Sequence, residues 1–381
     1  MRIIDRYMLR QFLSTFVICY VSLLGLYVVF DLFTNLEDFL AAAGDSGGVL
    51  QLITSFYSYQ AVLFFDRTAG LLALVAAMFT ITWIQRHNEL TALMAAGIAR
   101  TRVALPVVIA AIAITFVAAA NRELVIPQFS EQLSRRPRDM KAEVGKDIVL
   151  KADAVTDILL DGEQAYADEQ RIGHPHFSLP VPSSLDRYGQ HLTAEDAYYK
   201  PPQGDRPGGY LLCGVSKPAE LSEKESLTLD GKPVVIMPRD APQWLEKDQC
   251  FVVSNVTFRQ LAAGDSWREF ASTSQLIAGL KNPSLDFGAR IRVAIHSRIV
   301  QPLLDVTLLF LGLPLVLRRS TRNVFAAIGM CAAIVTLFMG VTIVCRHMGE
   351  VYWVPSASLA AWLPLFIFVP VATFMSEAMQ R

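Results

Sequence analysis

Few residues in this sequence have the types and spacing that catalysis or metal binding requires. His174 and His176 are two positions apart, as two metal ligands on one strand would be, but no convincing third ligand accompanies them. The chain has no G-x-x-x-x-G-K-[ST] segment to hold nucleotide phosphates, and no H-E-x-x-H or G-x-S-x-G segment for hydrolysis. We therefore expect no metal site and no catalytic residue, and a partner must supply the energy for any work.

Asp305 is the ionisable residue whose position most suggests a function. It lies in an apolar run, thirteen residues before Arg318, so a helix would place it roughly 20 Å from that end of the run. An ionisable side chain inside a membrane span indicates function by default. We expect Asp305 to face a polar cavity or to pair with Arg67 or Arg298, and a purely structural carboxyl is the alternative.

A short helix is predicted between two apolar runs, in the segment HNELTALMAAGIARTR that begins at His87. Asn88 is a suitable N-cap, Glu89 suits the positive end of the helix dipole, and Gly97 can end the helix in a left-handed cap. Apolar and small side chains fall on separate faces of this helix. They are Leu90, Leu93 and Met94 on one face, and Ala92, Ala95 and Ala96 on the other. Such a helix could receive force from a soluble motor, or could simply rest against lipid headgroups.

The composition indicates a membrane protein with several spans. Of the 381 residues, 53% are hydrophobic and 18% are charged, and the mean hydropathy is +0.37, too apolar for a soluble enzyme of this length. The net charge of −1 gives no excess of basic residues that would indicate nucleic-acid binding. A helix needs about 20 apolar residues to cross the hydrocarbon core. The predicted spans are residues 12–30, 63–84, 103–120, 299–317, 324–345 and 356–375.

Arginines in the short connections predict the orientation of these spans. They are Arg2, Arg6, Arg10, Arg86, Arg100, Arg102, Arg318, Arg319, Arg322 and Arg381. Six spans bring all of them to one side, which should be cytoplasmic. We therefore expect both termini in the cytoplasm and residues 121–295 outside it.

The segment outside the membrane has the pattern of a β domain. Short β-type runs such as GYLLCGV and CFVVSNVTF alternate with turn signals such as PPQGDRPGG, which predicts an all-β sandwich or jelly roll. A helical stalk, broken by Pro127, should connect it to the third span. Cys213 and Cys250 lie in β-type runs, and a disulfide and two separate thiols both remain open.

Several segments resemble the lipopolysaccharide-export permeases, the F and G subunits of the Lpt transporter. ELTALMAAGIARTR, from Glu89, is similar to their coupling helix, and NRELVIPQ to their exit from span three. SRIVQPLLDVTLLFLGLPLVLRRS and VPSASLAAWLPLFIF are similar to their fourth and sixth spans, and LTAEDAYYK resembles their β domain more loosely. The order of these motifs, and three spans on each side of a β domain, carry the resemblance.

The resemblance implies a subunit of an ATP-driven lipid exporter. Two such permeases pair with a cytoplasmic ATPase dimer, extract lipopolysaccharide from the inner membrane, and pass it through periplasmic jelly rolls to a bridge protein with a related domain. ATP and Mg²⁺ would be bound by the partner ATPase, and this chain would hold no cofactor. Glu89 would contact the ATPase through an arginine there, with Leu90, Leu93 and Met94 packing into its groove before Gly97 ends the helix.

The resemblance also implies that spans one and five form the seams between paired permeases. Small residues that would suit close helix packing there are Ser22, Gly25, Gly329, Ala333 and Gly340. Packing within the chain is the alternative for these positions.

One segment departs from the family pattern. The outer end of span one should present cations to lipid phosphates, but here it reads FDLFTNLEDFL, with Asp31, Glu37 and Asp38. Arg122 is among the cations that could replace them, and the cargo could be a glycolipid with fewer phosphates.

We therefore predict an α+β membrane protein of the bacterial inner membrane. Its parts are residues 1–120 with spans one to three and the coupling helix 88–97, residues 121–295 with the stalk and jelly roll, and residues 296–381 with spans four to six. A membrane transmitter that relays ATPase motion to a periplasmic partner without moving lipid is the main alternative. The F-like or G-like character and homo- or heterodimeric pairing remain open.

Overall fold

The computed structural model describes most of the chain, and it forms two compact units. The described residues are 3–43, 48–134, 146–148, 150–166, 169–179, 191–204, 206–218, 221–229, 231–241, 243–262, 264–284, 288–317, 324–351 and 353–380. Arg2, Arg318, Arg319, Arg322 and Arg381, used above to predict orientation, lie outside them. One unit comprises residues 1–37, 49–129 and 288–381, and the other residues 38–48 and 130–287.

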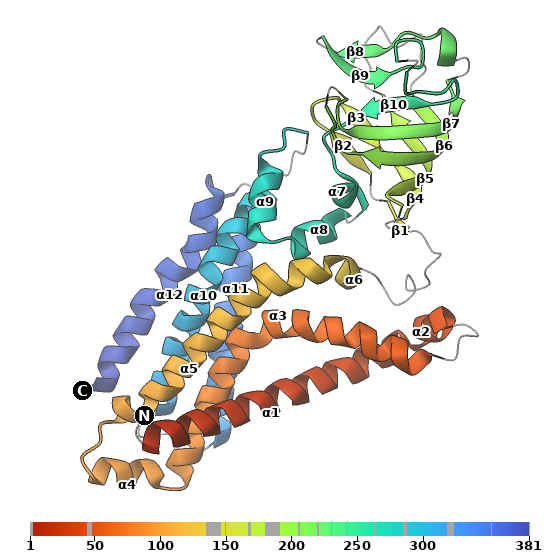
Figure 1. The fold of residues 1–381 in the computed structure, drawn as a ribbon. Helices are drawn as coiled ribbons and strands as arrows, with labels where there is room; N and C mark the ends of the chain where they lie inside the picture. The colour runs from red at the N-terminus through yellow and green to blue at the C-terminus, as the bar shows by residue number, and fades with distance from the viewer. Residues whose placement is uncertain are drawn as a thin grey trace. The chain divides into compact units, whose positions relative to one another are not determined.

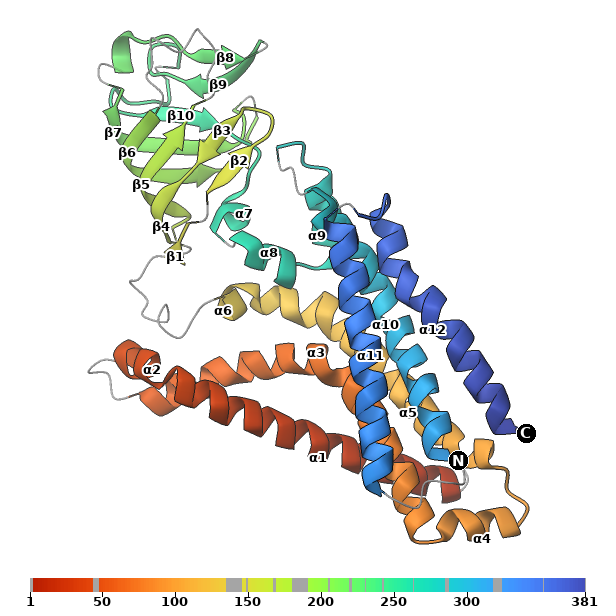
Figure 2. The same cartoon turned by 180° about the vertical axis from the view of Figure 1, so that it is seen from behind.

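The first unit is a bundle of long helices (Figures 1 and 2). Its helices are α1 (Ile3–Thr34), α3 (Val49–Arg86), α4 (Glu89–Ala95), α5 (Arg100–Ala120), α10 (Gly288–Leu317), α11 (Val324–Glu350) and α12 (Ala357–Gln380). Among the described residues, six helices are long and apolar enough to cross a membrane, which confirms the predicted number of spans. The short α4 lies at the end of the bundle where α1 begins and α12 ends.

Small and aliphatic residues hold the bundle together. Ala73, Ala76 and Ala77 of α3 are at most 2% exposed, which lets α3 approach its neighbours closely. Val107 of α5 and Leu308 of α10 belong to the same buried cluster.

Helix α1 differs from the other spans because only its first half is buried. Met8, Phe12 and Phe16 pack in the core of the bundle, whereas side chains from Val17 to Phe33 include many exposed apolar ones. In both views the second half of α1 runs away from α10, α11 and α12.

The chain does not simply break at Pro127. It continues from α5 as a π-helical segment, Asn121–Val125, and a 3₁₀ segment, Ile126–Phe129, before α6 (Ser130–Ser134). Proline has no N–H to donate to the preceding turn, so the helix changes its hydrogen-bond spacing there. The predicted break is therefore a change of helix type.

The second unit is a curled antiparallel sheet with short helices. Its strands are β1 (Lys146–Asp147), β2 (Lys151–Asp153), β3 (Ile158–Leu160), β4 (Gly162–Tyr166), β5 (Arg171–Ser178), β6 (His191–Lys200), β7 (Gly209–Lys217), β8 (Leu227–Leu229), β9 (Lys232–Ile236) and β10 (Cys250–Val253). The helices are α2 (Leu36–Ala43), whose first two residues belong to the bundle unit, α6, α7 (Phe258–Ala262), α8 (Gly264–Phe270) and α9 (Thr273–Leu280). The strand order is β1-β4-β5-β6-β7-β10-β9-β8, with β3 pairing both β2 and β5.

One face of this sheet forms a continuous apolar core. Phe177, Leu192, Tyr210 and Leu212 are fully buried in one cluster, and the Tyr210 hydroxyl donates to the Val256 carbonyl oxygen at 3.0 Å. Apolar side chains on alternate residues of antiparallel strands produce such a face. Six apolar helices with an antiparallel sheet unit between α5 and α10 confirm the predicted α+β membrane class.

The two outer cysteines are free thiols. Cys250 pairs with Leu212 across β10 and β7, so it shares a face with Leu212, while the next residue, Cys213, points to the other face. Side chains on opposite faces cannot form a disulfide. Burial raises the pKa of the Cys250 thiol to about 12, so this thiol stays protonated and unreactive.

Candidate functional site

Helix α4 begins and ends by different means. Its C-terminus has the predicted left-handed cap: Gly97 has φ 81°, its N–H donates to the Met94 carbonyl at 2.9 Å, and the Ile98 N–H donates to the Leu93 carbonyl at 3.1 Å. Asn88 does occupy the predicted N-cap position, but its side chain does not cap the helix. Asn88 has φ 59° and makes no side-chain capping bond, because the chain turns directly from α3 into α4 through that left-handed residue.

The apolar stripe of α4 faces its own bundle. Leu90 is 6% exposed, and Leu93 and Met94 are half-buried against the same core. The bundle therefore covers Leu90 and part of Leu93 and Met94, and the entry of these residues into a groove of the ATPase stays a prediction. The opposite face remains exposed, and its residues are Thr91, Ala92, Ala95 and Ala96.

Polar contacts fix the two ends of the loop that carries α4. The Tyr7 hydroxyl of α1 donates to the Glu89 carboxylate, at 3.0 Å from Oε2. Arg102, at the start of α5, pairs with Asp5 of α1 at 2.8 Å. The Arg100 Nε donates to the Met94 sulfur at 3.0 Å. Helix α4 therefore presents Glu89 and an alanine-rich face from a fixed position at one end of the bundle.

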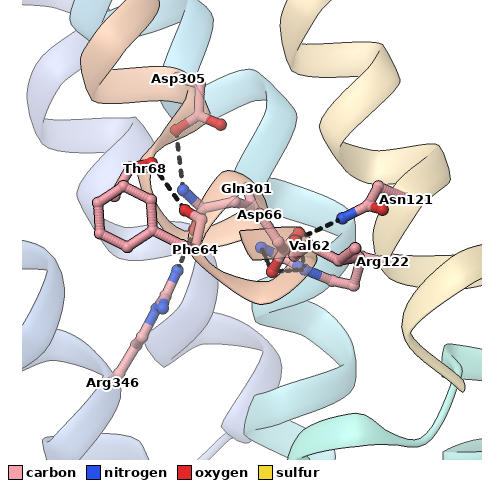
Figure 3. A network of polar contacts seen from close by, with 9 residues as sticks. All are labelled: Val62, Phe64, Asp66, Thr68, Asn121, Arg122, Gln301, Asp305 and Arg346. Atoms are coloured by element: carbon pink, nitrogen blue, oxygen red, sulfur yellow. Dashed lines mark hydrogen bonds and ion pairs between the residues drawn. The ribbon is translucent and has the colours of Figure 1, made fainter. Parts of the chain in front are cut away.

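A second candidate site is a cluster of polar side chains within the bundle (Figure 3). Asp305 of α10 accepts a hydrogen bond from the Gln301 amide at 2.8 Å, and the Gln301 carbonyl oxygen accepts one from Arg346 of α11 at 2.5 Å. Gln301 therefore connects a carboxylate to a cation. The sequence pointed to Arg67 or Arg298 as the partner of Asp305, but the cation that Asp305 reaches through Gln301 is Arg346.

An ion pair joins α3 to the π-helical segment in the same cluster. Arg122 contacts both carboxylate oxygens of Asp66 at 2.9–3.0 Å, and the two side chains are only 22% and 7% exposed. The Asn121 amide donates to the Val62 carbonyl beside it. Arg122, considered above as a cation for lipid phosphates, is therefore already committed to Asp66.

Gly70 of α3 lets Asp305 approach the helix backbone. A Cβ atom at this position would lie 2.5 Å from the Asp305 Cγ, which real structures do not tolerate. The close approach explains how a carboxylate fits between α3 and α10 in the bundle.

We expect Gly70→Ala to lower the free energy of unfolding by about 1–3 kcal/mol, because the new methyl group overlaps the carboxyl. The measurement is thermal unfolding of the purified protein in detergent. The double variant Gly70→Ala/Asp305→Ala removes the overlapping atoms and should recover most of the loss. An unchanged melting temperature in Gly70→Ala would contradict the close approach.

The remaining predicted positions are on the outside of the bundle or near it. Arg67 is exposed and Arg298 is half-buried. Ser22 and Gly25 of α1, and Gly329, Ala333 and Gly340 of α11, are all exposed. A Cβ atom added to Gly25, Gly329 or Gly340 would meet nothing within 4 Å. Among the described residues, these three glycines therefore make no close packing contact, unlike Gly70.

Comparison with known families agrees with this arrangement. The family model for the lipopolysaccharide export system permease LptF/LptG matches residues 6–157 and 221–377. The chain belongs to the LptF/LptG family. The match includes α4, every predicted span and the polar cluster, and it omits residues 158–220, which carry the middle strands β3 to β7. No curated protein matches the chain.

Membership of the LptF/LptG family makes the chain a membrane transport component of the lipopolysaccharide export system. The residues that the sequence did not single out are Tyr7, Asp66, Gln301 and Arg346. Asp66 could have been found by the reasoning applied to Asp305, since both are carboxylates within apolar helices.

Proposed function

We propose that this protein is a permease subunit of an ATP-driven exporter that extracts lipopolysaccharide or a related glycolipid from the inner membrane and passes it to a periplasmic bridge protein. Its termini and α4 face the cytoplasm, and the sheet unit faces the periplasm. A second permease of the family and a cytoplasmic ATPase dimer complete the exporter, and ATP and Mg²⁺ bind to the ATPase. Family membership is the observation that carries this proposal.

The contact with the ATPase is assigned to Glu89 and the exposed face of α4. Thr91, Ala92, Ala95 and Ala96 are exposed, and small side chains allow a second surface to approach closely. Leu90, Leu93 and Met94 support this face from the bundle side. Force applied to α4 therefore acts on the core of the bundle.

The contact with a second permease is assigned to α1 and α11. Both expose small residues, including Gly25 and Gly340, together with large apolar side chains such as Ile18 and Ile343. In a membrane, small residues on an exposed helix face favour close helix association.

The polar cluster is assigned to the part of the bundle that lipid headgroups pass. Asp305, Arg346 and the pair Asp66–Arg122 lie together on α3, α10, α11 and the π-helical segment. Arg67 and Arg298 are further candidates for contact with the cargo. Charged groups inside a membrane protein usually mark a pathway or a functional pair.

One observation favours the alternative, a transmitter that moves no lipid. An apolar inner face of the sheet suits lipid passage, but here that face is filled, with Phe177, Leu192 and Leu212 fully buried. A filled interior is the feature expected of a domain that only relays motion.

Purification of the tagged protein from its native membranes in mild detergent, with mass spectrometry of everything that accompanies it, tests the proposal. An ATPase, a second permease and a bound glycolipid are the expected result. An ATPase without lipid would favour the transmitter, and recovery of neither would contradict both.

A further inference from the structure

The first turns of α1 contact both ends of the loop that carries α4. Asp5 pairs with Arg102 at 2.8 Å, and Tyr7 donates to Glu89 at 3.0 Å. Asp5 and Tyr7 are two residues apart and reach opposite sides of the loop. Glu89, the first residue of α4, is thus in direct contact with the start of α1.

Helix α4 depends on such contacts for its position. It has seven residues, and an isolated helix of this length is not stable in water, so tertiary contacts must hold it. Leu90 anchors it to the bundle core, and the Tyr7–Glu89 bond ties its first turn to α1. A displacement of α4 would therefore pull directly on the Tyr7 side chain through this hydrogen bond.

Helix α1 can magnify such a displacement. Its buried residues are Met8, Phe12 and Phe16. Beyond them many side chains are exposed, but Tyr20 and Asp31 bond α3 at Ala61 and Tyr57, so α1 would move together with the first half of α3. With a rise of about 1.5 Å per residue, Tyr7 lies about 8 Å from Phe12, and Thr34 lies about 33 Å from Phe12 on the other side. A rotation of α1 about Phe12 would therefore move Thr34 about four times as far as Tyr7.

We propose that Tyr7 is a positioning residue that transmits movement of Glu89 and α4 to α1, so that α1 swings at its far end when the ATPase acts. This inference rests on the proposed function, in which an ATPase contacts α4. The Tyr7 hydroxyl connects α1 to α4, since it is the group that donates a hydrogen bond to the Glu89 carboxylate.

The test is Tyr7→Phe, which removes one oxygen atom and keeps the ring. The Tyr7 side chain is exposed. The variant should therefore keep its melting temperature and its assembly with the ATPase and second permease. In complexes placed in phospholipid vesicles containing purified lipopolysaccharide, the lipopolysaccharide extracted per ATP hydrolysed should fall at least about threefold. Tyr20→Phe is the matched control, because its hydroxyl bonds the Ala61 carbonyl of α3 and not α4.

A second measurement reports the motion itself. Spin labels at Thr34 and at Ile299, both exposed, are introduced into a background without native cysteines. The distance between them should change when ATP binds to the wild-type complex, and should change much less in Tyr7→Phe. An equal change in both proteins, or an unchanged extraction ratio in Tyr7→Phe, would overturn the inference. If even the wild-type complex extracted no lipopolysaccharide, the proposed function would fail, while the label distances would still decide the role of Tyr7.

Discussion

We expect the replacement of Glu89 with arginine to uncouple ATP hydrolysis from lipid extraction. Glu89 lies in the first turn of α4, beside the exposed face assigned to the ATPase, and accepts a hydrogen bond from Tyr7. Reversing its charge would place a cation against the ATPase arginine in the proposed contact, and would also remove the acceptor for Tyr7. Because like charges at an interface cost several kcal/mol, we expect lipid extraction per ATP to fall by about tenfold or more.

The measurement compares ATP hydrolysis and lipopolysaccharide extraction by reconstituted complexes. The amount of protein in the membrane should not change, because Glu89 contributes nothing to the apolar spans. Glu195→Arg makes the same charge reversal at an exposed position on strand β6 and is the matched control. Full extraction by Glu89→Arg would remove Glu89 from the coupling mechanism.

Replacing Arg122 with leucine should destabilise the bundle strongly. Asp66 is 7% exposed and loses its ion-pair partner, and an uncompensated charge in such a place lowers the free energy of unfolding by about 3–5 kcal/mol. Thermal unfolding of the purified protein in detergent measures this loss.

Two further variants separate the ion pair from simple loss of an arginine. Asp66→Leu/Arg122→Leu removes both charges and should recover most of the stability, since apolar residues can replace a buried pair. Arg239→Leu breaks an exposed ion pair, in which the side chains of Arg239 and Glu225 are 51% and 62% exposed. It should lower the free energy of unfolding by less than about 1 kcal/mol. If Arg122→Leu were as mild as Arg239→Leu, the Asp66–Arg122 pair would have no structural importance.

The sequence was sufficient for features that depend on local pattern. Long apolar runs must form spanning helices, because a bilayer offers no partner for an unpaired backbone, and alternating runs must form strands. Gly97 was identified as a helix end because glycine readily adopts a positive φ. Asn88 was correctly identified as the N-cap residue, but its side chain makes no capping bond, because such a bond requires an extended backbone and the turn from α3 gives Asn88 a left-handed one.

Which neighbour each face meets depended on the tertiary structure. The stripe Leu90, Leu93 and Met94 is apolar whichever protein covers it, so the sequence could not distinguish the bundle from an ATPase groove. Likewise, Ser22 and Gly25 would suit packing inside or outside the chain, and only the structure places them on the exposed side of α1.

By itself, then, the sequence determined the six spans, the sheet unit between the third and fourth, and the existence of a short helix between spans two and three. These follow from hydrophobicity and backbone preference, which act over a few residues. The structure alone decided that Asp305 reaches Arg346 through Gln301, that Arg122 is held by Asp66, and that Glu89 bonds Tyr7. Each of these contacts joins residues on different helices, and the packing of those helices, not the spacing along the chain, determines which polar groups meet.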